Sequence, residues 1–162
     1  MIIKEQALSR DGYIINQNYT NNIPYGNNTS DYNGCGWISC YNLCHYLKKQ
    51  IEAKYIINFL EDYLWFNGSW GTSLTGVYKF MKSLGLPVKK LVGKKAIAKS
   101  TPKYGILFYF HGKGCHYTFF YKYNNTSNRF LNDSHKELDI KDLAQMLDKE
   151  VKCNICAAFI VQ

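Results

Sequence analysis

The spacing of apolar side chains divides the chain into a helical first half and a β-rich second half. Residues 35–49 repeat apolar positions with a helical period, at Ile38, Leu43 and Leu47, and end in lysines that suit the C-terminal end of a helix. The helical pattern returns in residues 56–64 and residues 72–84, so three helices are predicted before the chain changes period.

The second half alternates short apolar runs rich in aromatic and β-branched residues with turn sequences. The predicted strands are residues 105–110, 116–123, 129–133 and 156–161, with one helix at 140–150. The first two strands are joined by "HGKGC" as a hairpin. We therefore predict an α+β fold in which N-terminal helices pack on a C-terminal antiparallel sheet, with residues 1–162 forming a single domain.

Three segments carry no strong period. Residues 1–15 alternate weakly, as in a short strand, and residues 16–34 are polar and turn-rich, as in a long functional loop. Residues 89–103 hold six lysines, which are interpreted as a solvated connecting segment. Arginine and aromatic residues do not interleave there as they do in single-strand nucleic-acid binders, so no nucleic-acid partner is expected.

Composition narrows the class of protein. The formal net charge is +8, there is no apolar run of 18 residues, and the N-terminal residues lack the apolar core of a signal peptide. We therefore expect no membrane span and a cytoplasmic location. Cys40 and Cys44 with Cys153 and Cys156 offer an alternative four-cysteine zinc site, but we expect buried thiols and neither metal nor cofactor.

Cys35 is the candidate nucleophile. It lies at the predicted start of the first helix, where the helix dipole favours a thiolate, and glycine on both sides leaves room for a substrate backbone. His45 lies ten residues along the same helix, about 15 Å away by helical rise, which is too far to act on Cys35. His111 and His116 flank the hairpin turn, while His135 lies in a charged stretch and is expected to be solvated.

His116 is the favoured base because it opens a strand. If residues 116–123 pair antiparallel with residues 129–133, the end of strand 129–133 lies beside the start of strand 116–123. This brings Asp133 close to His116. Asn132 is a rival for orienting the imidazole, since a register slip of one residue exchanges the two side chains. A Cys–His–Asp set is common in unrelated chains, so this pattern alone leaves a structural role for Cys35 open.

The chain resembles papain-like cysteine peptidases of the C39 and C39-like group. The segments that carry the resemblance are "IPYGNN" (23–28), "NGCGWIS" (33–39), "GTSLTGVYKFMKSLGL" (71–86), "GILFYFHGKGCHYTFFYKY" (105–123) and "FLNDS" (130–134). They occur in the family's order, and the resemblance runs from about residue 20 to residue 160, nearly the whole chain.

The resemblance implies a role for each matching residue. Cys35 would be the nucleophile, His116 the general base and Asp133 the orienting acid. The family's oxyanion-hole glutamine is replaced at the nearest matching position by Asn28, because Gln17 lies far from the motif along the chain. The family's proline after the orienting acid is Ser134 here.

The implied activity is cleavage of a peptide bond through a thioester on Cys35. Members of the family often remove leader peptides after a double glycine as domains of exporters, and this sequence, with no ATPase motif, is expected to be a free-standing version. The expected partner is a peptide or protein substrate. Alternatives are a non-catalytic peptide-binding module, a thiol acyltransferase or amidase of transglutaminase-like or cell-wall-hydrolase type, and a structural protein.

Overall fold

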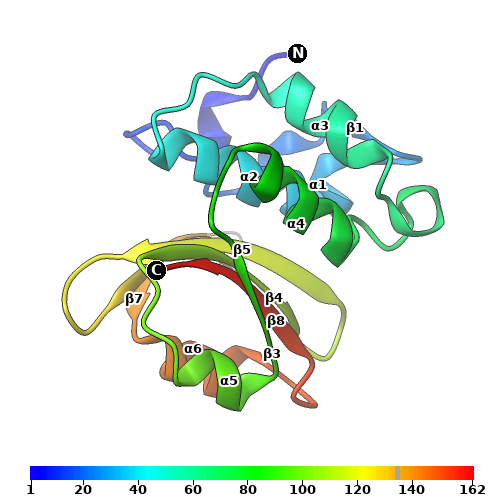
Figure 1. Ribbon diagram of the computed structural model, residues 1–162. Coiled ribbons are helices and arrows are strands. Elements are labelled where there is room, and N and C mark those ends of the chain that lie inside the picture. The colour runs from blue at the N-terminus through cyan, green and yellow to red at the C-terminus, as the bar shows by residue number, and fades with distance from the viewer. Residues whose placement is uncertain (134–135) are drawn as a thin grey trace.

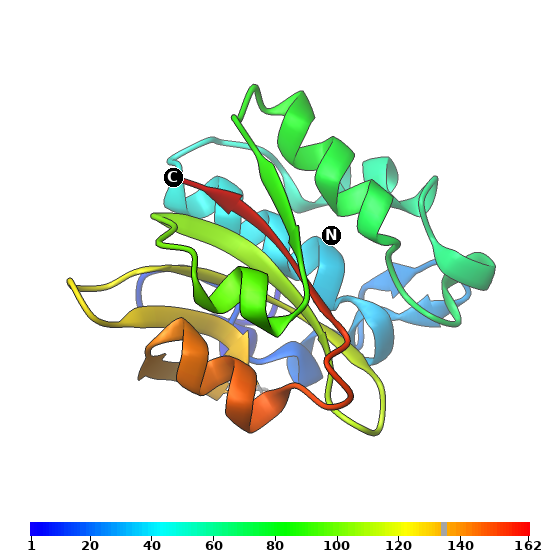
Figure 2. The ribbon, with the colours of Figure 1, turned by 60° about the horizontal axis from the view of Figure 1, so that its bottom comes forward.

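The computed structural model describes residues 1–133 and 136–162 and has three layers (Figure 1). A helical layer covers one face of a 6-stranded antiparallel sheet, and two short helices cover the other face. The helices are α1 (Ser30–Asn33), α2 (Cys35–Tyr46), α3 (Ala53–Glu61), α4 (Leu74–Ser83), α5 (Lys94–Ala98) and α6 (Leu143–Glu150). The first four form the helical layer, and α5 and α6 form the opposite one (Figures 1 and 2).

The sheet has the strand order β3-β8-β4-β5-β6-β7. Its strands are β3 (Lys89–Val92), β4 (Tyr104–Phe110), β5 (Cys115–Lys122), β6 (Asn128–Asp133), β7 (Lys136–Lys141) and β8 (Cys156–Val161). All neighbouring pairs are antiparallel, as predicted for β4, β5 and β6, and the last strand is inserted between β3 and β4. The predicted α+β arrangement, with the N-terminal helices on the C-terminal sheet, is confirmed.

Alternation along the strands explains why both faces of the sheet are covered. In β4, Ile106 and Phe108 contact the core under α2–α4, whereas Leu107 and Tyr109 contact the core under α5 and α6. All six residues of β8 are buried. Central strands buried on both faces read as continuous apolar runs, which is the pattern of "GILFYF" and "CAAFIV".

The expectations about two weakly patterned segments were wrong. The lysine-rich segment is not a plain connection: it forms edge strand β3 and helix α5, which buries Ile97. Lysines on an edge strand hinder pairing with another chain, so the composition that hid the strand also protects it. Residues 16–34 contain η2 (Gln17–Thr20), β1 (Pro24–Tyr25), β2 (Asn28–Thr29) and α1 rather than one loop.

The last helix and the N-terminal segment also differ from the sequence prediction. The helix predicted at 140–150 begins at Leu143, because the Asp142 side chain accepts from the Gln145 N–H and caps it there. The preceding residues belong to β7, which was not predicted. Residues 1–15 contain η1 (Glu5–Ala7) and a single bridge between Leu8 and Ile14 in place of a strand. Among the described residues, no helix has the length and apolar character to cross a bilayer.

Candidate active site at the start of helix α2

Cys35 lies one helical turn further into the helix than the sequence predicted. Helix α1 runs into α2 through Gly34, which has helical backbone angles, and the Gly34 N–H donates to the Ser30 carbonyl. The free N–H groups of the combined helix therefore lie near Ser30. Because the helix dipole acts mainly within the first turn, it favours a Cys35 thiolate less than expected.

The glycines beside Cys35 serve packing rather than an open approach to the sulfur. A Cβ on Gly36 would lie 2.3 Å from Thr72 Oγ1, and a Cβ on Gly34 would lie 2.4 Å from the Ser30 carbonyl oxygen. Both positions are closed by the protein itself, so the expectation that they admit a substrate backbone was wrong. The small residues let α2 lie directly against the segment that contains Thr72.

A cavity of about 480 Å³ opens beside Cys35. It is lined by Tyr32, Asn33, Cys35, Ser69, Trp70, Gly71, Thr72, Phe108, Phe110, His111, Lys113, Gly114, Cys115 and Tyr117. Helix starts, the loop after α3 and the β4–β5 turn thus meet at one place. Lys113 and the titratable His111 are the basic residues of this lining, and it contains no carboxylate.

One wall of the cavity is aromatic and held in a fixed conformation. Trp70, 69% exposed, contacts the ring of Phe66, 74% exposed, at 5.7 Å between centroids. Phe66 and Asn67 both have positive φ, which is uncommon for residues other than glycine. The Asn33 side chain donates to the Gly68 carbonyl at 2.6 Å and ties the loop to the helix start. Exposed aromatics on a strained, anchored loop are typical of a recognition surface.

The Cys35 thiol is buried and held by the main chain. Burial raises its pKa to about 11, while hydrogen bonds from the backbone of Tyr117 and Gly36 act in the opposite direction. A thiol with this pKa is protonated at neutral pH. In the conformation described here, Cys35 therefore needs a base to remove its proton before it can act as a nucleophile.

His116, Asn132 and Asp133 come together at the ends of β5 and β6, as the predicted strand pairing requires. His116 Nε2 lies 2.6 Å from the main-chain oxygen of Asn132. The Asp133 carboxylate accepts from the Tyr109 hydroxyl at 2.7 Å, and the Tyr109 ring meets the His116 ring edge-on, with centroids 5.8 Å apart. His135 and Ser134, which the sequence analysis also considered, lie outside the described residues.

The carbonyl partner fixes the tautomer of His116. A carbonyl oxygen only accepts hydrogen bonds, so Nε2 carries the proton, and Nδ1 is the basic nitrogen of the neutral ring. The contact that orients the imidazole through Nε2 is thus a main-chain oxygen, not the side chain of either sequence candidate. Asn132 reaches this position through positive φ, at a register shift between Leu131 and Asp133.

Gln17 links the helix start to Asn132 on β6, the residue whose carbonyl contacts His116, which the sequence analysis did not expect. Its Nε2 donates to the Asp31 carbonyl at 3.0 Å, and its Oε1 accepts from Asn132 Nδ2 at 3.0 Å. The Gln17 N–H donates to Asn132 Oδ1 at 3.1 Å. Gln17 was set aside for its distance along the chain, although the polar segment that contains it was predicted to be functional.

Asn28 lies elsewhere. It is half-buried in β2, where it pairs with Tyr25, and it is not among the described residues that line the cavity. The structure therefore brings Gln17, and not Asn28, to the residues just before Cys35. The role of oxyanion donor that the sequence resemblance gives to Asn28 remains a prediction.

The two faces of β5 divide the site. Cys115 and Tyr117 line the cavity with Cys35, whereas His116 pairs with Tyr109, whose side chain belongs to the other face of the sheet. The connection between His116 and Cys35 runs through the main chain. The residue after His116 is Tyr117, whose main chain forms a hydrogen bond with the Cys35 sulfur. The imidazole that lines the cavity itself is His111.

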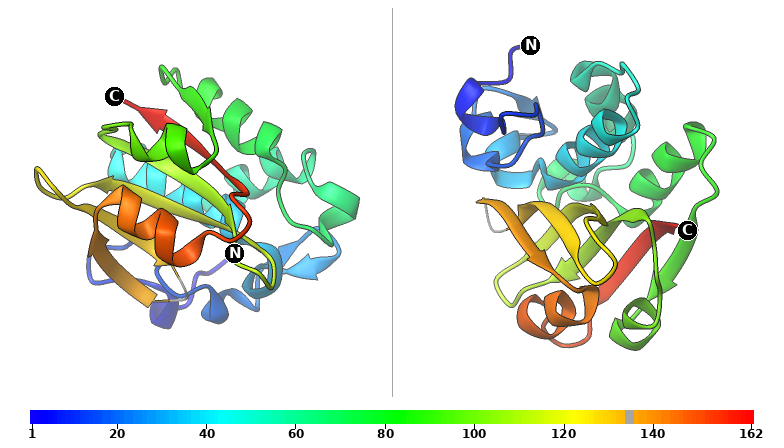
Figure 3. Two further views of the ribbon diagram at one scale, coloured as in Figure 1. Left: turned by 90° about the horizontal axis from the view of Figure 1, so that it is seen from below. Right: turned by 90° about the vertical axis from the view of Figure 1, so that its left-hand side faces the viewer.

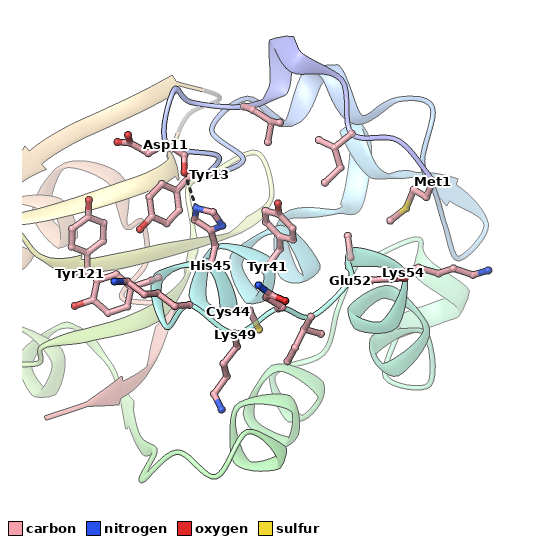
Figure 4. Close-up of a pocket in the computed structure, with 17 residues that line it drawn as sticks. Met1, Asp11, Tyr13, Tyr41, Cys44, His45, Lys49, Glu52, Lys54 and Tyr121 are labelled. Atoms are coloured by element: carbon pink, nitrogen blue, oxygen red, sulfur yellow. Dashed lines mark hydrogen bonds between the residues drawn. The ribbon is translucent and has the colours of Figure 1, made fainter.

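A second cavity, of about 1170 Å³, lies at the other end of α2 (Figure 4). The rings of Tyr13 and Tyr41 contact that of His45 there, and His45 Nε2 lies 2.7 Å from the Asp11 carbonyl oxygen. Cys44 is the thiol of this cavity.

The cysteines do not assemble as the zinc alternative requires. Cys40 and Cys44 belong to the core under α2, while Cys156 belongs to the core on the opposite face of the sheet. Figure 3 shows the sheet separating these layers. Within residues 1–133 and 136–162, no three His, Cys, Asp or Glu side chains gather as metal ligands would.

Two solved structures share this architecture. One is a double-glycine-motif protease from an AMS/PCAT transporter in complex with the leader peptide, with TM-score 0.55, 18% identity, and coverage of 79% of this chain and 84% of that chain. The other is the peptidase domain of Streptococcus ComA, a bi-functional ABC transporter of a quorum-sensing pathway. Its TM-score is 0.57 and its identity 13%, and the match covers 79% of this chain and 91% of that one.

No protein-family model matches the chain, and no curated protein sequence does. At these identities the structural likeness establishes the fold. The chain has the papain-like fold of C39 double-glycine peptidase domains, as the sequence resemblance predicted.

Proposed function

We propose that this protein is a cysteine peptidase in which Cys35 attacks a peptide carbonyl and His116 moves the protons. The observation that supports this most is that Cys35 and the strand that carries His116 border the same cavity, in a fold shared with peptidases. Tyr109, which is hydrogen-bonded to Asp133, would orient the imidazole through the edge-on contact between the Tyr109 and His116 rings.

The chemistry would run in two stages. His116 Nδ1 takes the Cys35 proton as the sulfur bonds to the carbonyl carbon, and the resulting imidazolium donates that proton to the leaving amine. Water, deprotonated by the same imidazole, then attacks the thioester and releases the acid and the thiol. Because burial raises the pKa of Cys35 to about 11, proton transfer would accompany attack rather than precede it.

The oxyanion of each tetrahedral intermediate would need hydrogen-bond donors. The Cys35 main-chain N–H is one candidate. The second is an amide side chain, and the position of Gln17 beside the Asp31 carbonyl favours it over Asn28. Gln17 Nε2 carries two hydrogens. One of them donates to the Asp31 carbonyl, and the other would donate to the oxyanion.

The substrate class we propose is a peptide laid between the aromatic wall at Trp70 and the β4–β5 turn. Removal of a leader peptide after a double glycine is the specific form of this activity, by analogy with the transporter protease described with its leader peptide. Neither glycine requires a side-chain pocket, so the aromatic wall would contact residues further from the cleaved bond.

Incubation with a peptide library tests the proposal. The library should include Gly-Gly sequences and matched Ala-Ala sequences, with products read by mass spectrometry. Cleavage by the unmodified chain that disappears in Cys35→Ala supports a peptidase, and preference for Gly-Gly supports leader processing. Absence of any cleavage would reject the enzymatic reading.

A peptide-binding module is the second candidate, favoured by two observations. The thiol is buried with a raised pKa, and strand pairing turns His116 to the face of Tyr109. A module of this kind would bind library peptides equally well with Cys35 or Cys35→Ala, and would cleave none of them.

A further inference from the structure

Two thiols line the cavity at the start of α2. Cys35 is 8% exposed, while Cys115 is exposed at the start of β5. Both are free. The proposed reaction uses only Cys35, so Cys115 is a nucleophilic group in the same cavity without a role.

The backbone of β5 directs Cys115 toward Cys35. Cys115 and Tyr117 are two residues apart in one strand, so their side chains share a face, and that face is turned to α2. The Tyr117 main chain bonds to the Cys35 sulfur. Cys115 is therefore the next side chain along the face that the sulfur already contacts.

The hairpin end gives Cys115 room to adjust. It is the first residue of β5, opposite the last residue of β4, and it follows a turn in which Gly112 has φ 96°. A disulfide needs Cα atoms roughly 4.4–6.8 Å apart, which a strand end reaches more easily than a strand centre.

The other four thiols are placed differently. Cys40 and Cys44 are buried in the core under α2, and Cys156 is buried on the other face of the sheet. Cys153 is exposed in the turn before β8, but it does not line the cavity. It provides a matched exposed thiol for comparison with Cys115.

We propose that Cys35 and Cys115 form a reversible disulfide when the protein meets a hydroperoxide. The Cys115 thiolate attacks the peroxide oxygen, giving a sulfenic acid and releasing an alcohol or water. The Cys35 sulfur then attacks the sulfenic sulfur, the S–O bond breaks, and water leaves with the Cys35 proton. Two thiols are oxidised, one peroxide is reduced, and a dithiol reductant reverses the step.

The consequence would be a nucleophile that is masked rather than destroyed. Without a second thiol, continued oxidation carries a cysteine to sulfinic and sulfonic acids, which dithiols do not reduce. The disulfide stops that sequence. Its effect on activity rests on the proposed peptidase function, whereas its formation does not.

Peroxide treatment of the full chain tests the linkage. Hydrogen peroxide near stoichiometric amounts at about pH 8.5, followed by N-ethylmaleimide, should remove two of the six thiols. Chymotrypsin without reduction should release residues 33–37 joined to residues 111–117, two peptides with one cysteine each. Dithiothreitol should restore both thiols.

Two variants give the controls. Cys115→Ser should abolish the cross-linked peptide, because the thiol that reacts with the peroxide is then absent. Cys153→Ser should keep the cross-link at the level of the unmodified chain.

Separate oxidation of Cys35 and Cys115 in the unmodified chain, or a link from Cys35 to another cysteine, would overturn the proposal. A Cys35–Cys115 link in a protein that cleaves no peptide would support the disulfide and reject the peptidase. Cleavage without the link would do the reverse.

Discussion

The two ends of helix α2 each border a cavity with a cysteine and a histidine, and they differ in what surrounds the sulfur. Cys35 borders about 480 Å³ and Cys44 about 1170 Å³, so the larger cavity is not the one with the candidate chemistry. Burial raises the pKa of Cys35 to about 11 and that of Cys44 to about 12. Of these two thiols, only Cys35 receives a main-chain hydrogen bond from a neighbouring strand. This bond acts against the rise in pKa that burial causes.

The histidines differ in the same way. His45 is exposed, bonded to the Asp11 carbonyl and surrounded by tyrosine rings. His116 is half-buried, and the carbonyl that fixes it belongs to Asn132, whose side chain is itself held by Gln17. A pocket with polar side chains becomes a candidate active site when the orientation of those side chains is fixed by the fold, not when it is large.

Removal of the two histidines should separate the two ends most clearly. His116→Ala should lower peptide turnover by roughly 10²–10⁴-fold, because the general base is lost. His45→Ala should leave turnover within about twofold, since the ring lies at the far end of α2. Initial rates on one cleaved library peptide measure both.

His111→Ala is the stricter control, since His111 lines the cavity with Cys35. If turnover collapses in His111→Ala and survives in His116→Ala, the base has been assigned to the wrong histidine.

The link from Gln17 should matter for both rate and stability. Gln17→Ala removes an amide worth about 10²–10³ in rate if it is the oxyanion donor. It also removes the partner of the buried Asn132 Nδ2, while Asn132 Oδ1 keeps its hydrogen bond from the main-chain N–H of residue 17, and the loss costs about 1–3 kcal/mol of unfolding free energy. Turnover and urea unfolding of the variant measure these two effects.

Asn28→Ala is the matched comparison, because both residues are amides upstream of Cys35. A large fall in turnover with Asn28→Ala and none with Gln17→Ala would restore the sequence-based assignment. At the other end of α2, Gln50→Ala should change neither rate nor stability, since that amide is exposed.

Periodicity identified the elements that build the site but not the contacts that complete it. Helix α2 was predicted from the helical spacing of its apolar positions, and strands β4, β5, β6 and β8 from short runs rich in aromatic and β-branched residues between turns. The pairing of β5 with β6 then placed the ends of both strands together. Strand β3 was missed because its lysines point to solvent at a sheet edge, where hydrophobic alternation is not required.

The remaining site contacts depend on backbone features that residue spacing does not encode. The Asn132 carbonyl reaches His116 through a residue with positive φ at a strand irregularity. Gln17 contacts Asn132 across 115 positions of sequence. The strained loop at Phe66 likewise follows from tertiary hydrogen bonds to Asn33. Asparagine before a strand end was a visible signal, since Asn tolerates positive φ.

Cys35 and Cys44 should also differ in the pH at which alkylation levels off. Alkylation of Cys35 should rise about tenfold per pH unit and level off near pH 11, with Cys44 levelling off at higher pH. Because the fold favours the protonated thiols, their contribution to stability is complete below the ordinary pKa of 9.0 and is lost as the pH rises above it. Peptide mass spectrometry after brief iodoacetamide pulses follows both sites.

The outcome that would contradict this is a plateau for Cys35 near pH 6. That result would mean that an imidazolium already pairs with the thiolate. Cys35→Ser should make unfolding less sensitive to pH above 9.0 than the unmodified chain.

The smallest expected effect comes from the aromatic walls of the two cavities. Trp70 is 69% exposed, so Trp70→Ala removes little buried surface and should change the free energy of unfolding by less than about 0.5 kcal/mol. A substrate side chain resting on the indole would lose about 1 kcal/mol of binding, which raises KM by roughly 3–10-fold with kcat nearly unchanged. Tyr41→Ala, on the wall of the His45 cavity, is the matched aromatic variant and should leave KM unchanged. Steady-state kinetics on a peptide with a large apolar residue, and on the same peptide with alanine there, distinguish contact from distortion. If Trp70→Ala raises KM equally for both peptides, or lowers kcat instead, Trp70 acts on the conformation of its loop and not by contact with the substrate. The strain at Phe66 then needs another explanation.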